Sequence, residues 1–78
     1  MIYCKLKEEH ATFAIYQFGM STEDMSGEAI IYSSFIEPKI LKHPIKRKAS
    51  QSWLNRVVIK YKKDLFDGHF PDRMSYEI

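Results

Sequence analysis

The sequence predicts an α+β domain in which a three-stranded antiparallel sheet is packed by one C-terminal helix, with the tail able to add a fourth short strand. Three observations lead to this fold class. The chain has 78 residues, which is enough for a single small domain spanning 1–78. Its first half holds three apolar segments with strand-like patterns, and its last third holds apolar residues at helical spacing. The expected order of elements is therefore β-β-β-α.

The expected strands cover about 1–8, 11–18 and 28–36. In the first strand, Ile2, Cys4 and Leu6 alternate with more polar residues, as in a strand that is exposed on one face. The second and third strands carry bulky residues on both faces. The faces that we expect the helix to cover include Phe13, Ile15 and Ile31. The opposite faces carry Ala14, Tyr16, Phe18, Ile30, Tyr32 and Ile36.

The expected helix covers about 51–67, where apolar residues recur every three or four positions. Its apolar stripe consists of Leu54, Val57, Val58, Tyr61 and Leu65. We expect Leu54, Val58, Tyr61 and Leu65 to be largely buried. Gly68 stands where a glycine commonly ends a helix. Two prolines predict that 37–48 is an exposed connection or an irregular edge. The tail after Gly68 either adds an edge strand or wraps around the helix.

Charge is divided unevenly along the chain, although the formal net charge is only +2. Residues 39–63 hold nine basic residues and no acid, whereas both flanking segments are acidic. Such a block predicts a local positive field. The expected basic patch comprises Lys42, Lys46, Arg47, Lys48, Trp53, Arg56, Lys60 and Lys63. Alternatively, this segment is a solvated connection whose cations pair with the acidic loops.

Apolar residues exceed what one helix on one face of the sheet can bury. Ile59 and Phe66 share a flank of the helix outside its apolar stripe. The expected partner-binding residues are Tyr16, Phe18, Tyr32, Ile59 and Phe66. Either the tail and residues 37–48 cover this surface, or a protein partner or a second copy of the chain does.

The sequence predicts no catalytic site, no metal and no cofactor. His10, His43 and His69 are scattered without metal-binding spacing. Cys4 is expected to be a buried, inert thiol. An acid–base pair of His69 with Asp72 is the weaker alternative. Glu23 and its neighbour Asp24 supply too few oxygens for calcium.

These patterns favour a small cytoplasmic protein that is not an enzyme. A single cysteine suits a reducing compartment, and the sequence shows neither a signal peptide nor a membrane span. We expect a stoichiometric regulator of the antitoxin or immunity type, which masks a partner surface. The alternative is a nucleic-acid-binding domain that uses the basic segment 39–63.

Overall fold

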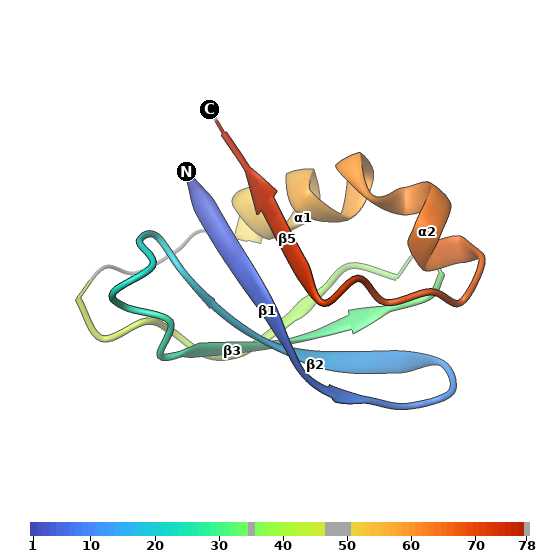
Figure 1. Ribbon diagram of the computed structural model, residues 1–78, viewed down its shortest axis with the longest axis horizontal. Helices are drawn as coiled ribbons and strands as arrows, with labels where there is room; N and C mark the ends of the chain where they lie inside the picture. The colour runs from blue at the N-terminus through green and yellow to red at the C-terminus, as the bar shows by residue number, and fades with distance from the viewer. Residues whose placement is uncertain (35, 47–50, 78) are drawn as a thin grey trace.

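A computed structural model describes residues 1–34, 36–46 and 51–77, and it confirms the α+β class with an antiparallel sheet. The sheet has five strands in the order β4-β3-β2-β1-β5, so the expected number of three was wrong. The strands are β1 (Ile2–Glu9), β2 (Phe13–Gly19), β3 (Gly27–Tyr32), β4 (Lys39–Lys42) and β5 (Arg73–Tyr76). The helical region is divided into α1 (Gln51–Lys60) and α2 (Lys62–Phe66), which lie along one side of the sheet (Figure 1).

The two additional strands come from segments whose pairing the sequence left open. The tail forms β5, which pairs with β1 at one edge of the sheet. Residues 39–42 form β4, which pairs with β3 at the other edge. Pro38 and Pro44 lie just outside β4, where their missing N–H groups cost the sheet no hydrogen bond. The third expected strand is shorter than predicted, since β3 ends at Tyr32.

The face of β2 that meets the helices is the reverse of the expected one. Cys4 pairs with Phe18, and Leu6 pairs with Tyr16, so these residues share the face that β1 turns toward the helices. Tyr16 and Phe18 are therefore fully buried. Phe13 and Ile15 are half-buried on the opposite side, which we call the open face. Since both faces of β2 are bulky, only the pairing with β1 decides between them.

The core between the sheet and the helices combines residues from every part of the chain. Leu54 and Leu65 are fully buried, as predicted, while Val58 and Tyr61 are only half-buried. Val57 completes the buried stripe of the helices. From the strands and the tail, the fully or nearly fully buried residues include Ile2, Cys4, Ala14, Ala29, Ile31, Phe70 and Met74. Gly68 has a φ of 81°, which confirms its expected position at the end of the helical region.

The loop between β2 and β3 is fastened to the segment after β4. The carboxylate of Asp24 accepts hydrogen bonds from the hydroxyl of Ser26 and from the backbone N–H of Lys46. The backbone N–H of Ile45 in turn donates to the hydroxyl oxygen of Ser26. Gly19 allows the loop to pass close over β2, because a Cβ there would lie 1.6 Å from the carbonyl oxygen of Asp24. This contact requires glycine.

Neither α1 nor α2, within the described residues, is long and apolar enough to cross a membrane.

Candidate functional site

Three exposed apolar side chains surround a groove between the helices and the segment that leads into β4. Ile36, Ile59 and Phe66 are 59 %, 64 % and 37 % exposed, and all three line this groove, which has a volume of about 220 Å³. Val58 and Pro38 supply further apolar lining, and the polar lining residues are Ser34, Glu37, Asn55 and Lys62. We call this feature the helix groove. Its apolar surface is continuous across segments that are about twenty residues apart in sequence.

Side-chain hydrogen bonds hold the two walls of the helix groove together. The side-chain amide of Gln51 donates to the carbonyl oxygen of Pro38 and, over 3.1 Å, to the side-chain oxygen of Asn55. The amide of Asn55 donates to a carboxylate oxygen of Glu37 over 2.8 Å. The wall formed by residues 36–38 is thus tied to α1 at several points.

The structure separates the five residues expected to bind a partner into three places. Ile59 and Phe66 lie together in the helix groove. Tyr32 lies on the open face, half-buried beside its cross-strand neighbour Phe13. Tyr16 and Phe18 belong to the core and offer no surface to a partner, which corrects their expected position. Sequence periodicity did not identify Ile36 as part of the groove, because it lies outside any regular element.

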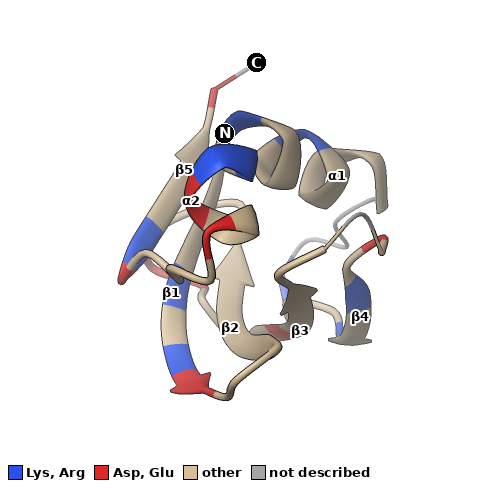
Figure 2. Ribbon diagram, turned by 90° about the vertical axis from the view of Figure 1, so that its right-hand side faces the viewer, with Lys and Arg blue, Asp and Glu red and all other residues tan. Residues whose placement is uncertain are grey.

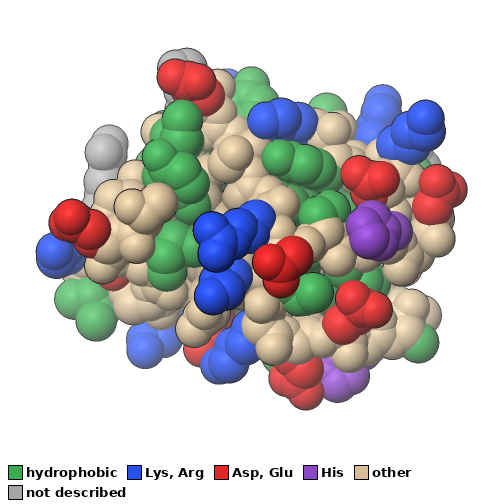
Figure 3. Space-filling model, in the orientation of Figure 1, with side chains coloured by type: hydrophobic (Ala, Val, Ile, Leu, Met, Phe, Trp, Pro, Cys, Tyr) green, Lys and Arg blue, Asp and Glu red, His purple; other side chains and the backbone are tan. Residues whose placement is uncertain are grey.

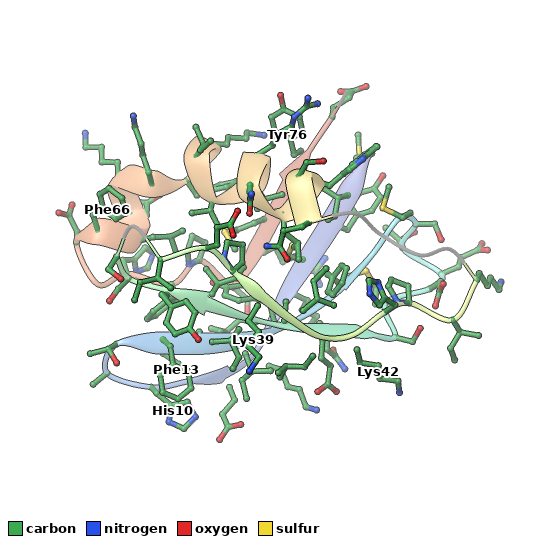
Figure 4. All side chains as sticks on the ribbon, turned by 180° about the vertical axis from the view of Figure 1, so that it is seen from behind. His10, Phe13, Lys39, Lys42, Phe66 and Tyr76 are labelled. Carbon is green, nitrogen blue, oxygen red and sulfur yellow. The ribbon has the colours of Figure 1, made fainter. Side chains whose placement is uncertain are left out.

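The open face of the sheet combines aromatic and basic side chains. Phe13 pairs with Tyr32, and the ring of His10 stacks on Phe13 with 4.5 Å between centroids. Figure 4 shows His10, Phe13, Lys39 and Lys42 pointing away from the helices, whereas Phe66 lies on the helix side. The strand register places Lys5, Lys39, Lys42 and Arg73 on this face. Lys7 joins them through its ion pair with Glu28.

The expected basic patch is divided between two sides of the molecule. Arg56, Lys60 and Lys63 are exposed, as predicted, and the basic residues of α1 and α2 lie away from the sheet in Figure 2. Lys42 instead points to the open face (Figure 4), opposite Glu28. Lys46 is exposed beside the Asp24 loop. Trp53 is half-buried against the core. Arg47 and Lys48 lie outside the described residues. Lys42 and the cations of the helices thus lie on opposite sides of the sheet (Figure 4), although the linear sequence places them together.

One cation of the helix face has a structural contact. The ammonium group of Lys60 donates to the carbonyl oxygen of Ser75 over 2.9 Å and lies 5.3 Å from the ring centroid of Tyr61. The Tyr61 hydroxyl accepts a hydrogen bond from the backbone N–H of Ser75. Among the described residues, no ion pair joins Arg56, Lys60 or Lys63 to an acid.

The groups considered for catalysis were the thiol of Cys4 and the pair of His69 with Asp72. Burial raises the pKa of the Cys4 thiol to about 12, so this thiol stays protonated at neutral pH. Within the described part of the chain, no hydrogen bond or ion pair links His69 to Asp72. The same residues contain no group of three His, Cys, Asp or Glu side chains placed to hold a metal ion.

The chain was compared with models of protein families, with curated proteins and with solved structures, and none of them gave a significant match.

Proposed function

We propose that this protein is a non-catalytic, cytoplasmic binding module that masks a surface of a protein partner by means of the helix groove. The observation that carries the proposal is the convergence of Ile36, Ile59 and Phe66 on one groove. Three of the six exposed large apolar side chains among the described residues lie there. Exposed apolar surface of this kind is costly in water and favours burial by a partner.

The polar rim of the helix groove supports a protein as the ligand. Glu37 and Lys62 border the apolar centre with opposite charges, as the polar edge of a protein interface does. Hydrogen bonds already fix the wall at residues 36–38. Binding of a partner side chain in the groove therefore costs little free energy for ordering this protein. The partner is expected to insert one or two apolar side chains.

Site-specific photo-cross-linking tests this function. In the test variant, a photoreactive phenylalanine analogue replaces Ile59, which lines the groove. In the matched control it replaces Arg56, which is exposed on the same helix but does not line the groove. Both variants are expressed in the organism that encodes the protein. The expected result is a discrete adduct at position 59 that is absent at position 56. Equal labelling at both positions, or none at 59, contradicts the proposal.

Light scattering distinguishes a foreign partner from a second copy of the chain. If the groove binds a second copy, the purified protein should have the mass of a dimer, and Phe66→Ser should convert it to the monomer. If the groove binds a foreign protein, both forms should be monomers. In that case the photo-cross-linked adduct should contain a second protein.

Nucleic-acid binding is a second candidate function, favoured by the composition of the open face. Five cations from β1, β4 and β5 share this face with the aromatic pair of Phe13 and Tyr32, and the only acids on this face of the described strands are Glu8 and Glu28. Cations attract phosphates of any sequence, and aromatic rings stack on unpaired bases. The binding surface of this candidate is the open face of the sheet and not the whole segment 39–63 that the sequence suggested. Lys39 and Lys42 belong to both.

Salt dependence tests the second candidate. Affinity for a single-stranded oligonucleotide should fall steeply, by at least about tenfold, between about 50 and about 200 mM salt if several phosphates are neutralised. Protein binding centred on the apolar groove should change little over the same range. An oligonucleotide affinity that is absent at low salt contradicts the nucleic-acid function and leaves the groove proposal intact.

A further inference from the structure

A second depression, which we call the β1/β5 pocket, lies on the open face where β1 meets β5 and the loop after β2. It has a volume of about 460 Å³, within the range of sites that hold small ligands. Its lining includes Tyr3, Lys5, Gln17, Thr22, Arg73 and Ser75. Figure 3 looks onto this side of the molecule and shows Lys and Arg side chains gathered near its middle. Neither the groove proposal nor the predicted basic segment uses this pocket.

The strand register brings two cations together at this pocket. Lys5 on β1 pairs with Arg73 on β5, and on its other side it pairs with Gln17 on β2. Paired residues of neighbouring strands point to the same face, so the three side chains form one row across the sheet. Two like charges directly opposite each other repel and destabilise the pair. An anion bound between Lys5 and Arg73 would relieve this repulsion.

The described residues leave these two cations almost without neutralising partners. No carboxylate among them forms an ion pair with Lys5. Arg73 has only its neighbour Asp72, at 4.0 Å, and both side chains are more than three-quarters exposed, so this contact is weak. The nearby carboxylate of Glu28 is occupied by Lys7 at 2.8 Å. The pocket therefore carries a net positive charge that is available to a ligand.

The remaining lining residues indicate which anion the pocket would accept. Gln17, Thr22 and Ser75 supply neutral hydrogen-bond donors for oxygen atoms. Tyr3 supplies an aromatic ring that is half-buried in the same pocket. A phosphate would fit the cations and the hydrogen-bond donors, and a flat aromatic ring would fit the ring of Tyr3. A nucleotide carries both groups. A base inside a duplex does not present its ring face, so the nucleotide must be unpaired.

We propose that the β1/β5 pocket binds one nucleotide unit of a single-stranded nucleic acid, with a phosphate between Lys5 and Arg73 and a base against Tyr3. This inference rests on the second candidate function and names its central contact. The strand continues from this pocket across the open face toward Phe13 and Tyr32, whose rings offer further stacking surfaces.

Fluorescence anisotropy with a labelled oligothymidylate tests the inference. The double variant Lys5→Gln/Arg73→Gln should weaken binding at least about tenfold and lower the slope of log affinity against log salt by about 0.7, the value for the one phosphate that both side chains contact. The matched control Arg56→Gln/Lys63→Gln loses the same charge from the helix side. It should change affinity by less than about twofold, because Arg56 and Lys63 belong to α1 and α2 and do not line the β1/β5 pocket.

Substitutions of Tyr3 test the stacking contact separately. Tyr3→Leu keeps apolar bulk but removes the ring, and it should weaken binding at least about fivefold. Tyr3→Phe keeps the ring and should bind like the unaltered protein. Thermal unfolding of each variant establishes that it is folded before the affinities are compared.

The outcomes separate this inference from the function on which it rests. If the unaltered protein binds no oligothymidylate, both fall. If it binds, but the pocket and control double variants weaken binding equally, general charge attraction is sufficient and only the pocket assignment falls. If thymidine monophosphate binds as tightly as the oligonucleotide, the pocket serves a free nucleotide and the single-strand assignment is overturned.

Discussion

The hydroxyl of Tyr16 donates a 2.6 Å hydrogen bond to the backbone carbonyl of Pro71, 55 residues further along the chain. Tyr16 lies on the central strand β2 and is fully buried, and Pro71 lies just before β5. Beside it, the backbone N–H of Leu6 donates to the carbonyl of Asp72 over 2.8 Å. These two bonds fix the start of the tail strand against the sheet. Burial is the main cause that raises the pKa of the Tyr16 hydroxyl, which keeps it a donor.

Removing this hydroxyl should destabilise the protein without creating a large cavity. Tyr16→Phe leaves the Pro71 carbonyl without its donor, and we expect a loss of about 1–2 kcal/mol in the free energy of unfolding. Urea unfolding followed by circular dichroism measures this loss. The control is Tyr32→Phe, whose hydroxyl makes no hydrogen bond to the described residues, and which should change stability by less than about 0.5 kcal/mol. Equal effects of the two substitutions would contradict the structural role of the Tyr16 bond.

The burial of α2 depends mainly on one side chain. Leu65 is fully buried, and Leu65→Ala should cost about 2–4 kcal/mol because it removes buried carbon atoms and leaves a cavity. Ile59→Ala, at a position 64 % exposed, should cost less than about 0.5 kcal/mol. The free energies of unfolding in urea provide the comparison. A cost for Leu65→Ala as small as that for Ile59→Ala would mean that α2 does not pack on the sheet.

Two glycines should respond differently to the same added methyl group. Gly19→Ala would bring Cβ against the backbone of Asp24, so the loop must move, at a cost of at least about 2 kcal/mol. Gly68→Ala meets no atom within 4 Å, and only its positive φ opposes the change, at about 1 kcal/mol. Thermal or urea unfolding ranks the two variants. The reverse order would show that the loop adapts easily.

Acid should weaken the fastening of the loop between β2 and β3. The hydrogen bonds from Ser26 and Lys46 lower the pKa of Asp24 below its ordinary value of 3.8. A carboxylate with a lowered folded pKa stabilises the fold fully above its ordinary pKa, and this contribution is lost as the pH falls through the lowered value. Asp24→Asn does not titrate, so its stability should be lower near neutral pH and should fall less in acid.

Urea midpoints of both proteins from about pH 6 to about pH 2 test this expectation. The carboxylate of Glu28 also has a lowered pKa, because Lys7 donates a hydrogen bond to it, and it titrates in both proteins. The difference between the two curves therefore isolates Asp24. Curves that run parallel through the acid range would show that Asp24 contributes nothing through its charge.

The sequence predicted part of the helix stripe correctly, although Val58 and Tyr61 are only half-buried. Leu54 and Leu65 are buried and Gly68 ends the helical region, because helical periodicity and a glycine stop are local signals. The identity of the buried face of β2 was not predictable in the same way. Both of its faces are bulky, and the pairing of Cys4 with Phe18 decides which face meets the helices. That pairing is a property of the assembled sheet.

For the candidate surfaces too, the sequence predicted the contacts within one helix but not the contacts between distant segments. The flank with Ile59 and Phe66 was predicted from helical spacing, and these residues do line one groove. Ile36 joins them only through the folding of the segment before β4. The pairing of Lys5 with Arg73 joins the two ends of the chain. Charge counts along the sequence cannot reveal a contact between residues so far apart.

The contacts of Ser75 with Lys60 and Tyr61 have a consequence for how this sheet behaves at high concentration. β5 is an edge strand, and an uncovered edge can template the addition of a strand from another molecule. Here the outward N–H and carbonyl groups of Ser75 are already engaged by side chains from the helical layer. A second chain would have to displace both side chains before it could extend the sheet. The helical layer thus makes the addition of a strand at Ser75 less favourable.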